Sequence, residues 1–146
     1  MNEANNLQIP TQPPLVIADV SRCPSINFFN VDCIEFMKSK PDKCYDLAIV
    51  DPPYGIDRGV WDNRPPQEYW NELFRVSKEQ IIWGGDYFDL PPSRCILCWD
   101  KVQPWENFSQ VELAWTSFDS PAHLYRFDNR TGDKIHPTQK PVQLYE

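Results

Sequence analysis

The stretch YDLAIVDPPYG, residues Tyr45–Gly55, decides how this chain is interpreted. Its first six residues are mostly apolar and end in β-branched side chains, which predicts a buried strand of an α/β sheet. Pro52 and Pro53 have no N–H to donate, and a proline keeps the residue before it extended. We therefore expect a rigid exit from the strand that presents the Asp51 carboxylate, the Pro52 carbonyl and the Tyr54 ring. In open α/β sheets, ligands bind at that edge.

These three groups suit the alkylation of an exocyclic amino group on a nucleobase. The nitrogen lone pair of such an amine is delocalised into the ring, and two acceptors for its N–H groups would localise it. Asp51 and the Pro52 carbonyl can act as these acceptors and stabilise the developing positive charge. Tyr54 would stack on a base that has been taken out of the duplex. A strand followed by a plain proline-rich turn explains the same residues equally well.

A second unusual string, IHPTQKPV, occupies Ile135–Val142. Together with Asp51–Tyr54 it resembles the DNA amino-methyltransferases that use S-adenosylmethionine, in the circular order that places the catalytic motif before the cofactor motif. The resemblance runs from about residue 27 to residue 146. Its other matching segments are Asp32–Met37, Pro41-Asp42, Ile81–Phe88 and Glu112–Ser117.

The resemblance implies an α/β, Rossmann-like methyltransferase sheet, present as its catalytic half over residues 26–146. It also implies transfer of a methyl group from S-adenosylmethionine to a flipped base of double-stranded DNA, with adenine N6 expected rather than cytosine N4. By resemblance, the catalytic residues are Asp51, Pro52, Pro53 and Tyr54. The residues implied to bind the cofactor are Asp51, Thr138, Gln139, Lys140 and Pro141.

Plainer interpretations of the second segment exist. Lys140 is also explained as a solvated charge beside a helix start, and Pro141 as a favourable first-turn residue.

Asp32 stands before Cys33–Lys38 with Glu35 three positions on, which is typical of a helix N-cap and capping box. In the resembled family an acidic residue near Asp32 can face the cofactor's adenosine, but the cap is the favoured interpretation.

The family's glycine-rich cofactor turn is not found among the five glycines, since none lies in a Gly-x-Gly turn behind a strand. In the family that turn follows the helix that begins near Pro141. We therefore expect the chain to be the catalytic half of a larger enzyme, completed by a further segment or a second chain. The rival interpretation is a non-catalytic module that binds DNA or a partner chain.

Composition narrows the class of protein. A net charge of −7 argues against a general nucleic-acid-binding protein, although it leaves room for a DNA enzyme with local basic loops.

Five cysteines without a secretory signal predict that the protein resides in a reducing cytosol, and the resemblance implies a bacterial or phage-encoded protein. Cys95 and Cys98 have the spacing of zinc ligands, but on a strand they would face opposite sides. Buried, inert thiols are therefore expected, with no metal and no membrane span.

Along the chain, residues 1–25 are rich in Asn, Gln and Pro and predict a flexible arm. The loop Gly55–Pro66 carries Arg58, Trp61 and Arg64, which could contact DNA or belong to an ordinary solvated loop. Gly84-Gly85 is interpreted as a site wall, with a tight turn as the alternative.

A helix with an apolar stripe is expected from Pro65-Pro66 through Ser77. Further strands are expected at Ile26–Val31, Gln80–Trp83, Arg94–Trp99 and Val111–Phe118, and residues 119–134 are too short for a recognition domain.

Overall fold

The computed structural model of the chain describes residues 27–57, 59–128 and 139–145. By its internal contacts the chain divides into residues 1–30 and 31–146, and the fold described below is that of the second unit. Its elements are, in order, α1 (Cys33–Lys38), β1 (Tyr45–Val50), α2 (Gln67–Val76), β2 (Ser77–Trp83), the 3₁₀ turn η2 (Gly85–Tyr87), β3 (Ile96–Asp100), β4 (Val111–Thr116), β5 (His123–Arg126) and the 3₁₀ turn η3 (Val142–Leu144).

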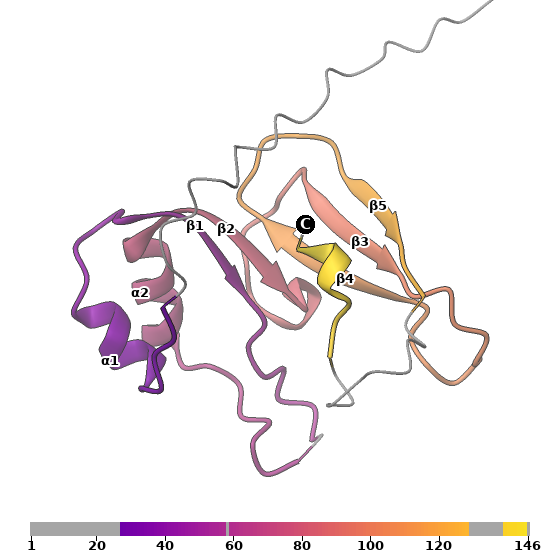
Figure 1. Cartoon of the computed structure of the whole chain (residues 1–146), viewed down its shortest axis with the longest axis horizontal. Coiled ribbons are helices and arrows are strands. Elements are labelled where there is room, and N and C mark those ends of the chain that lie inside the picture. The colour runs from indigo at the N-terminus through magenta and orange to yellow at the C-terminus, as the bar shows by residue number, and fades with distance from the viewer. Residues whose placement is uncertain (1–26, 58, 129–138, 146) are drawn as a thin grey trace, which may run out of the picture. The chain divides into compact units, whose positions relative to one another are not determined.

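The five strands form one mixed sheet in the order β1-β2-β4-β3-β5 (Figure 1). β1 runs parallel to β2 and β3 runs parallel to β5, whereas β4 is antiparallel to both of its neighbours. The chain passes from β1 to the parallel β2 through α2, which is the crossover that parallel strands require. The α/β class expected from the sequence is therefore present, with a mixed sheet.

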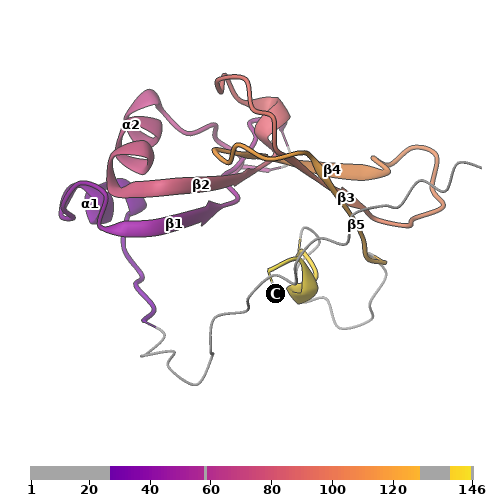
Figure 2. The same ribbon diagram turned by 90° about the horizontal axis from the view of Figure 1, so that it is seen from above.

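Two apolar clusters lie on opposite faces of this sheet. Figure 2 shows α1 and α2 on one face of β1 and β2, and it shows η3 on the opposite face. On the helical side, Leu73 and Val76 of α2 pack with Ile82 and Trp115 of the sheet. On the other side, the cluster consists of Trp83, Trp99 and Ala114, with Leu144 of η3 packed against it. η3 thus fixes the C-terminal segment against β2, where Trp83 ends the strand.

The prediction that Tyr45–Val50 is a buried strand is half wrong. Ala48 and Val50 pack toward the helical core, but the alternate side chains Tyr45, Leu47 and Ile49 are 37%, 42% and 45% exposed. β1 stands at one end of the strand order and has a single neighbouring strand among the described residues. Because the helices cover only one of its faces, the other face stays open.

The apolar stripe predicted for α2 is confirmed, since Tyr69 and Leu73 are buried and Trp70 and Phe74 pack against the same core. The helix ends at Val76 rather than Ser77, because Ser77 turns to extended geometry and becomes the first residue of β2. The Ser77 hydroxyl donates to the Leu73 carbonyl at 2.6 Å and so caps the helix end.

Other predicted boundaries need correction. The predicted strand Ile26–Val31 is not present over residues 27–31, which have irregular backbone, and Ile26 lies outside the described residues. β2 starts at Ser77 rather than Gln80, β3 spans Ile96–Asp100 rather than Arg94–Trp99, and β4 ends at Thr116 rather than Phe118. The strand β5 was not predicted. The helix expected from Pro141 is the single 3₁₀ turn η3, while the predicted arm, residues 1–25, lies outside the described residues.

The thiols follow the prediction of buried cysteines in part. Cys95 is buried and Cys98 is half-buried, but Cys33 and Cys44 are exposed. Among residues 27–57, 59–128 and 139–145, no group of three or more His, Cys, Asp or Glu side chains could hold a metal ion. Across the same described part of the chain, no helix has the length and apolar character needed to cross a membrane.

Candidate functional site

Asp51 lies directly beyond the last residue of β1 and receives two hydrogen bonds on its carboxylate. The Tyr54 hydroxyl donates to Oδ1 at 2.9 Å, and the Lys140 ammonium donates to Oδ2 at 2.5 Å. The Asp51 side chain is 38% exposed, whereas that of Lys140 is 5% exposed. The fold therefore brings together the two segments that the sequence singled out, which lie 89 residues apart.

Tyr54 is held by rings as well as by its hydrogen bond. Its ring stacks on Tyr87 of η2 with centroids 4.7 Å apart and planes 10° from parallel, and it meets the edge of Phe88. Burial raises the pKa of the Tyr54 phenol, and the nearby negative charge of Asp51 raises it further. The phenol thus remains a hydrogen-bond donor at neutral pH. One face of the ring, predicted to stack on a base, is already occupied by Tyr87.

Gly84 and Gly85 make room for the side chains around them. Gly84 has a φ of 67°, a left-handed conformation that suits glycine, and a Cβ there would overlap the Tyr54 ring. A Cβ on Gly85 would overlap Trp115 of β4. The Tyr54 ring therefore approaches the backbone closely at Gly84, and Trp115 does so at Gly85. Gly84 forms the wall against which the Tyr54 ring packs.

The interpretation of Lys140 as a solvated charge is wrong, because its side chain is buried among partners. Its Nζ lies 5.2 Å from the centroid of the Trp83 ring and 3.3 Å from Oε2 of Glu112 in β4. Glu112 Oε1 in turn pairs with Lys101 Nζ at 2.7 Å. Glu112 and Lys101 were missed in the sequence, although an acidic residue inside the otherwise apolar segment Val111–Thr116 is a signal that could have identified Glu112.

The loop between β1 and α2 is closed by Asp62, which the sequence did not single out. Asp62 is buried, and its two carboxylate oxygens accept from the N–H groups of Gly55 and Ile56 at 2.9 Å each. Arg64 donates to the Tyr87 carbonyl and lies 5.6 Å from the Phe88 ring centroid, so it ties the loop to η2. Trp61 is half exposed at the loop surface. Arg58, also predicted to contact DNA, lies outside the described residues.

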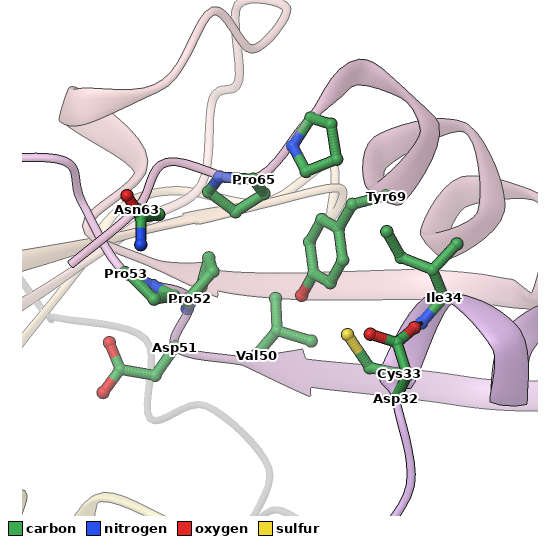
Figure 3. Close-up of a pocket in the computed structure, with 11 residues that line it drawn as sticks. Asp32, Cys33, Ile34, Val50, Asp51, Pro52, Pro53, Asn63, Pro65 and Tyr69 are labelled. Carbon is green, nitrogen blue, oxygen red and sulfur yellow. Dashed lines mark hydrogen bonds between the residues drawn. The ribbon is translucent and has the colours of Figure 1, made fainter. Parts of the chain in front are cut away.

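A cavity of about 440 Å³ adjoins Asp51 on the side of the helices, and Figure 3 shows Val50 lying between the side chains of Asp51 and Asp32. The predicted N-cap role of Asp32 is confirmed, since its Oδ1 accepts from Ile34 N at 2.9 Å and Glu35 N at 3.0 Å. The Glu35 carboxylate pairs with Lys38. The residues lining this cavity are Asp32, Cys33, Ile34, Val50, Asp51, Pro52, Pro53, Asn63, Pro65, Pro66 and Tyr69.

The remaining residues predicted to bind the cofactor flank Lys140. Pro141 is buried and Gln139 is half-buried, while Thr138 lies outside the described residues. Comparison with protein-family models gave no match, and comparison with curated proteins gave none either.

Proposed function

We propose that this chain is the catalytic part of an S-adenosylmethionine-dependent DNA amino-methyltransferase that methylates adenine at N6. The observation that carries the proposal is the placement of Asp51 at the carboxyl end of β1. There it is held by the Tyr54 hydroxyl and borders a cavity of about 440 Å³. That volume lies within the range of small-molecule sites, which runs from roughly 300 to 1,000 Å³.

The chemistry proposed for the residues follows from their donors and acceptors. Asp51 accepts a hydrogen bond from the target amine, and the Pro52 carbonyl accepts a second one. Both acceptors stabilise the positive charge that grows on the nitrogen as the new bond forms. Tyr54 fixes the orientation of the Asp51 carboxylate through its hydrogen bond at 2.9 Å. Because the base must leave the duplex to reach this edge, base flipping is part of the proposal.

The cavity suits the nucleoside part of the cofactor, although of the described residues predicted to bind the cofactor only Asp51 lines it, and Gln139, Lys140 and Pro141 do not. Its lining is largely apolar, with Val50, Pro52 and Tyr69 available for contact with a ring, and Asp32 supplies a carboxylate at one side. Both bonds of the helix cap fall on Asp32 Oδ1, so Oδ2 can accept from a ligand. S-adenosylmethionine, when bound, supplies the methyl group. The glycine-rich turn that usually contacts it is proposed to come from a further segment or a second chain.

The decisive substitution is Asp51→Ala, made in a version of the chain extended through a cofactor half. Losing this electrostatic contact is expected to lower the rate of methyl transfer to DNA by about a hundredfold or more while leaving the fold intact. Incorporation of labelled methyl groups measures the rate, and circular dichroism checks the fold. The control is Asp57→Asn, which removes a carboxylate from an exposed position in the same loop and keeps a residue that tolerates the φ of 60° found there.

If Asp51→Ala keeps most of the rate, the role assigned to Asp51 is wrong. If the extended protein transfers no methyl group but still binds DNA or the chain that supplies the glycine turn, the rival binding module replaces the enzyme.

A further inference from the structure

The Lys140 ammonium conflicts with the role proposed for Asp51. A carboxylate that is to stabilise growing positive charge on an amine works best while its own charge is uncompensated. At 2.5 Å, Lys140 Nζ cancels much of the Asp51 charge and occupies a lone-pair direction of Oδ2, the oxygen that Tyr54 leaves open. For the full negative charge of Asp51 to act on the amine, the Lys140 ammonium has to move away.

Glu112 offers the ammonium a second position. Its Oε1 is already paired with Lys101 Nζ, but Oε2 is buried and has no hydrogen-bond partner among the described residues. That oxygen lies 3.3 Å from Lys140 Nζ. A buried carboxylate oxygen left without a donor is unfavourable, so a small movement of Lys140 toward Glu112 satisfies it.

Three features of Lys140 and its surroundings favour this movement. Its four-carbon stem is flexible. The face of the buried Trp83 ring attracts the ammonium, whose Nζ lies 5.2 Å from the ring centroid. Lys101 and Lys140 balance Asp51 and Glu112 in formal charge, so the movement redistributes charge within the group without creating a net buried charge.

We propose that Glu112 is a positioning residue that draws the Lys140 ammonium away from Asp51 and so exposes the full charge of Asp51 to the substrate amine. The inference rests on the proposed function for its catalytic meaning, although the two positions of Lys140 are a property of the free protein. Lys101 keeps the Glu112 carboxylate oriented with Oε2 toward Lys140.

The test is an NMR measurement on the isotopically labelled 146-residue chain, in the absence of DNA and cofactor. Hydrogen bonds transmit scalar couplings between the Lys140 Nζ nitrogen and the carboxyl carbons that accept from it. In the native sequence we expect couplings to the carboxyl carbons of both Asp51 and Glu112. Glu112→Gln should enlarge the coupling to Asp51, because the competing charge is gone. The matched control is Glu106→Gln, an exposed acid in the neighbouring loop, which should leave both couplings unchanged.

Coupling to Asp51 alone in the native chain, or to neither residue, would overturn the inference. In a preparation that methylates DNA, Glu112→Gln should lower the methyl-transfer rate on the order of tenfold relative to Glu106→Gln, and Glu112→Asp should restore part of it. Equal rates in the two Gln variants would contradict the positioning role. If the unsubstituted preparation transfers no methyl group, the proposed function fails, whereas the couplings still decide where Lys140 resides.

Discussion

The identity of residue 51 bears on which base would be methylated. Asp51 is an ionised acceptor, and a charge-assisted hydrogen bond to an amino group is stronger than one to a neutral hydroxyl. The geometry at the end of β1 does not separate adenine from cytosine, because both present an exocyclic amine beside a ring nitrogen. The preference for adenine comes from the resemblance, in which aspartate at this position goes mostly with adenine and serine mostly with cytosine.

We accordingly expect N6-methyladenine as the product. DNA exposed to the chain extended through a cofactor half would be digested to nucleosides, and the modified nucleoside would be identified by its mass. N4-methylcytosine without N6-methyladenine would refute the assignment. DNA treated in parallel with the Asp51→Ala variant serves as the control, since it should carry neither product.

Gly84 is the second residue whose replacement is informative. Gly84→Ala should reduce methyl transfer strongly, because the added Cβ overlaps the Tyr54 ring and displaces the hydroxyl that holds Asp51. Gly55→Ala is a matched control for backbone strain, since Gly55 has a similar positive φ of 71° but would meet Arg64 rather than Tyr54. Both should lose about 1 kcal/mol or more of stability in denaturant titrations. Equal effects on activity would show that strain, and not the Tyr54 ring, matters.

At the level of elements, α1 depends on its N-cap residue, Asp32. The helix has six residues and is therefore too short to be stable on its own. Asp32→Ala removes the two cap bonds and should destabilise the protein by about 1 kcal/mol, whereas Asp32→Asn keeps an accepting oxygen and should change stability little. Chemical denaturation of both variants measures these differences in the free energy of unfolding.

The same pair of variants separates the two roles discussed for Asp32. If the carboxylate also contacts the adenosine of the proposed cofactor, Asp32→Asn should weaken binding of S-adenosylmethionine to the extended chain despite its intact cap. Unchanged binding in Asp32→Asn would leave the cap as the sole role of Asp32.

The elements predicted correctly from the sequence are those whose burial follows from the pattern of their own residues. β2, β3 and β4 were recognised from apolar runs, and α2 from its stripe, because those patterns reflect which side chains face the core. The run of β1 identified the strand but not its exposed face. β5 has four exposed residues with no alternation, and its place in the sheet comes only from pairing with β3. No local pattern specifies such a strand. The open face of β1 was missed for a related reason, since apolar residues occupy both of its faces.

The candidate site was predictable to the extent that its residues carry recognisable motifs. Asp51 and Tyr54 follow a strand and were identified by their own chemistry, whereas Lys140 was identified only by resemblance. Their contact spans 89 residues, and no spacing rule connects them. Glu112 and Asp62 escaped notice because each acts through a contact that only the fold creates. Glu112 lies on β4 with its Oε2 3.3 Å from the Lys140 ammonium, and Asp62 closes a loop.

For the molecule as a whole, we expect any affinity for DNA to depend on the overall balance of charges more than on any single cation. The net charge is −7, and many of the described cations are engaged in ion pairs within the chain, as in Arg75 with Glu72 and Asp42. Paired cations contribute little to counterion release, which dominates the affinity of proteins for DNA. If the chain acts on DNA, we therefore expect part of its phosphate contacts to come from a further segment or partner.

We expect the contacts with the cofactor, like those with DNA, to come in part from a further segment or partner. The 146-residue chain alone should therefore bind S-adenosylmethionine weakly or not at all. Its cavity offers Asp32, Asp51 and apolar contacts, but none of its lining residues is a glycine from a strand–Gly-x-Gly turn. Such a turn lets backbone N–H groups and a helix start approach the ligand closely, and without it few directional contacts remain. Isothermal titration calorimetry measures the affinity, and the chain joined to a cofactor half should bind more tightly by at least about tenfold. Tight, stoichiometric binding to the 146-residue chain would contradict this prediction and would mean that the cavity beside Asp51 is sufficient to hold the cofactor.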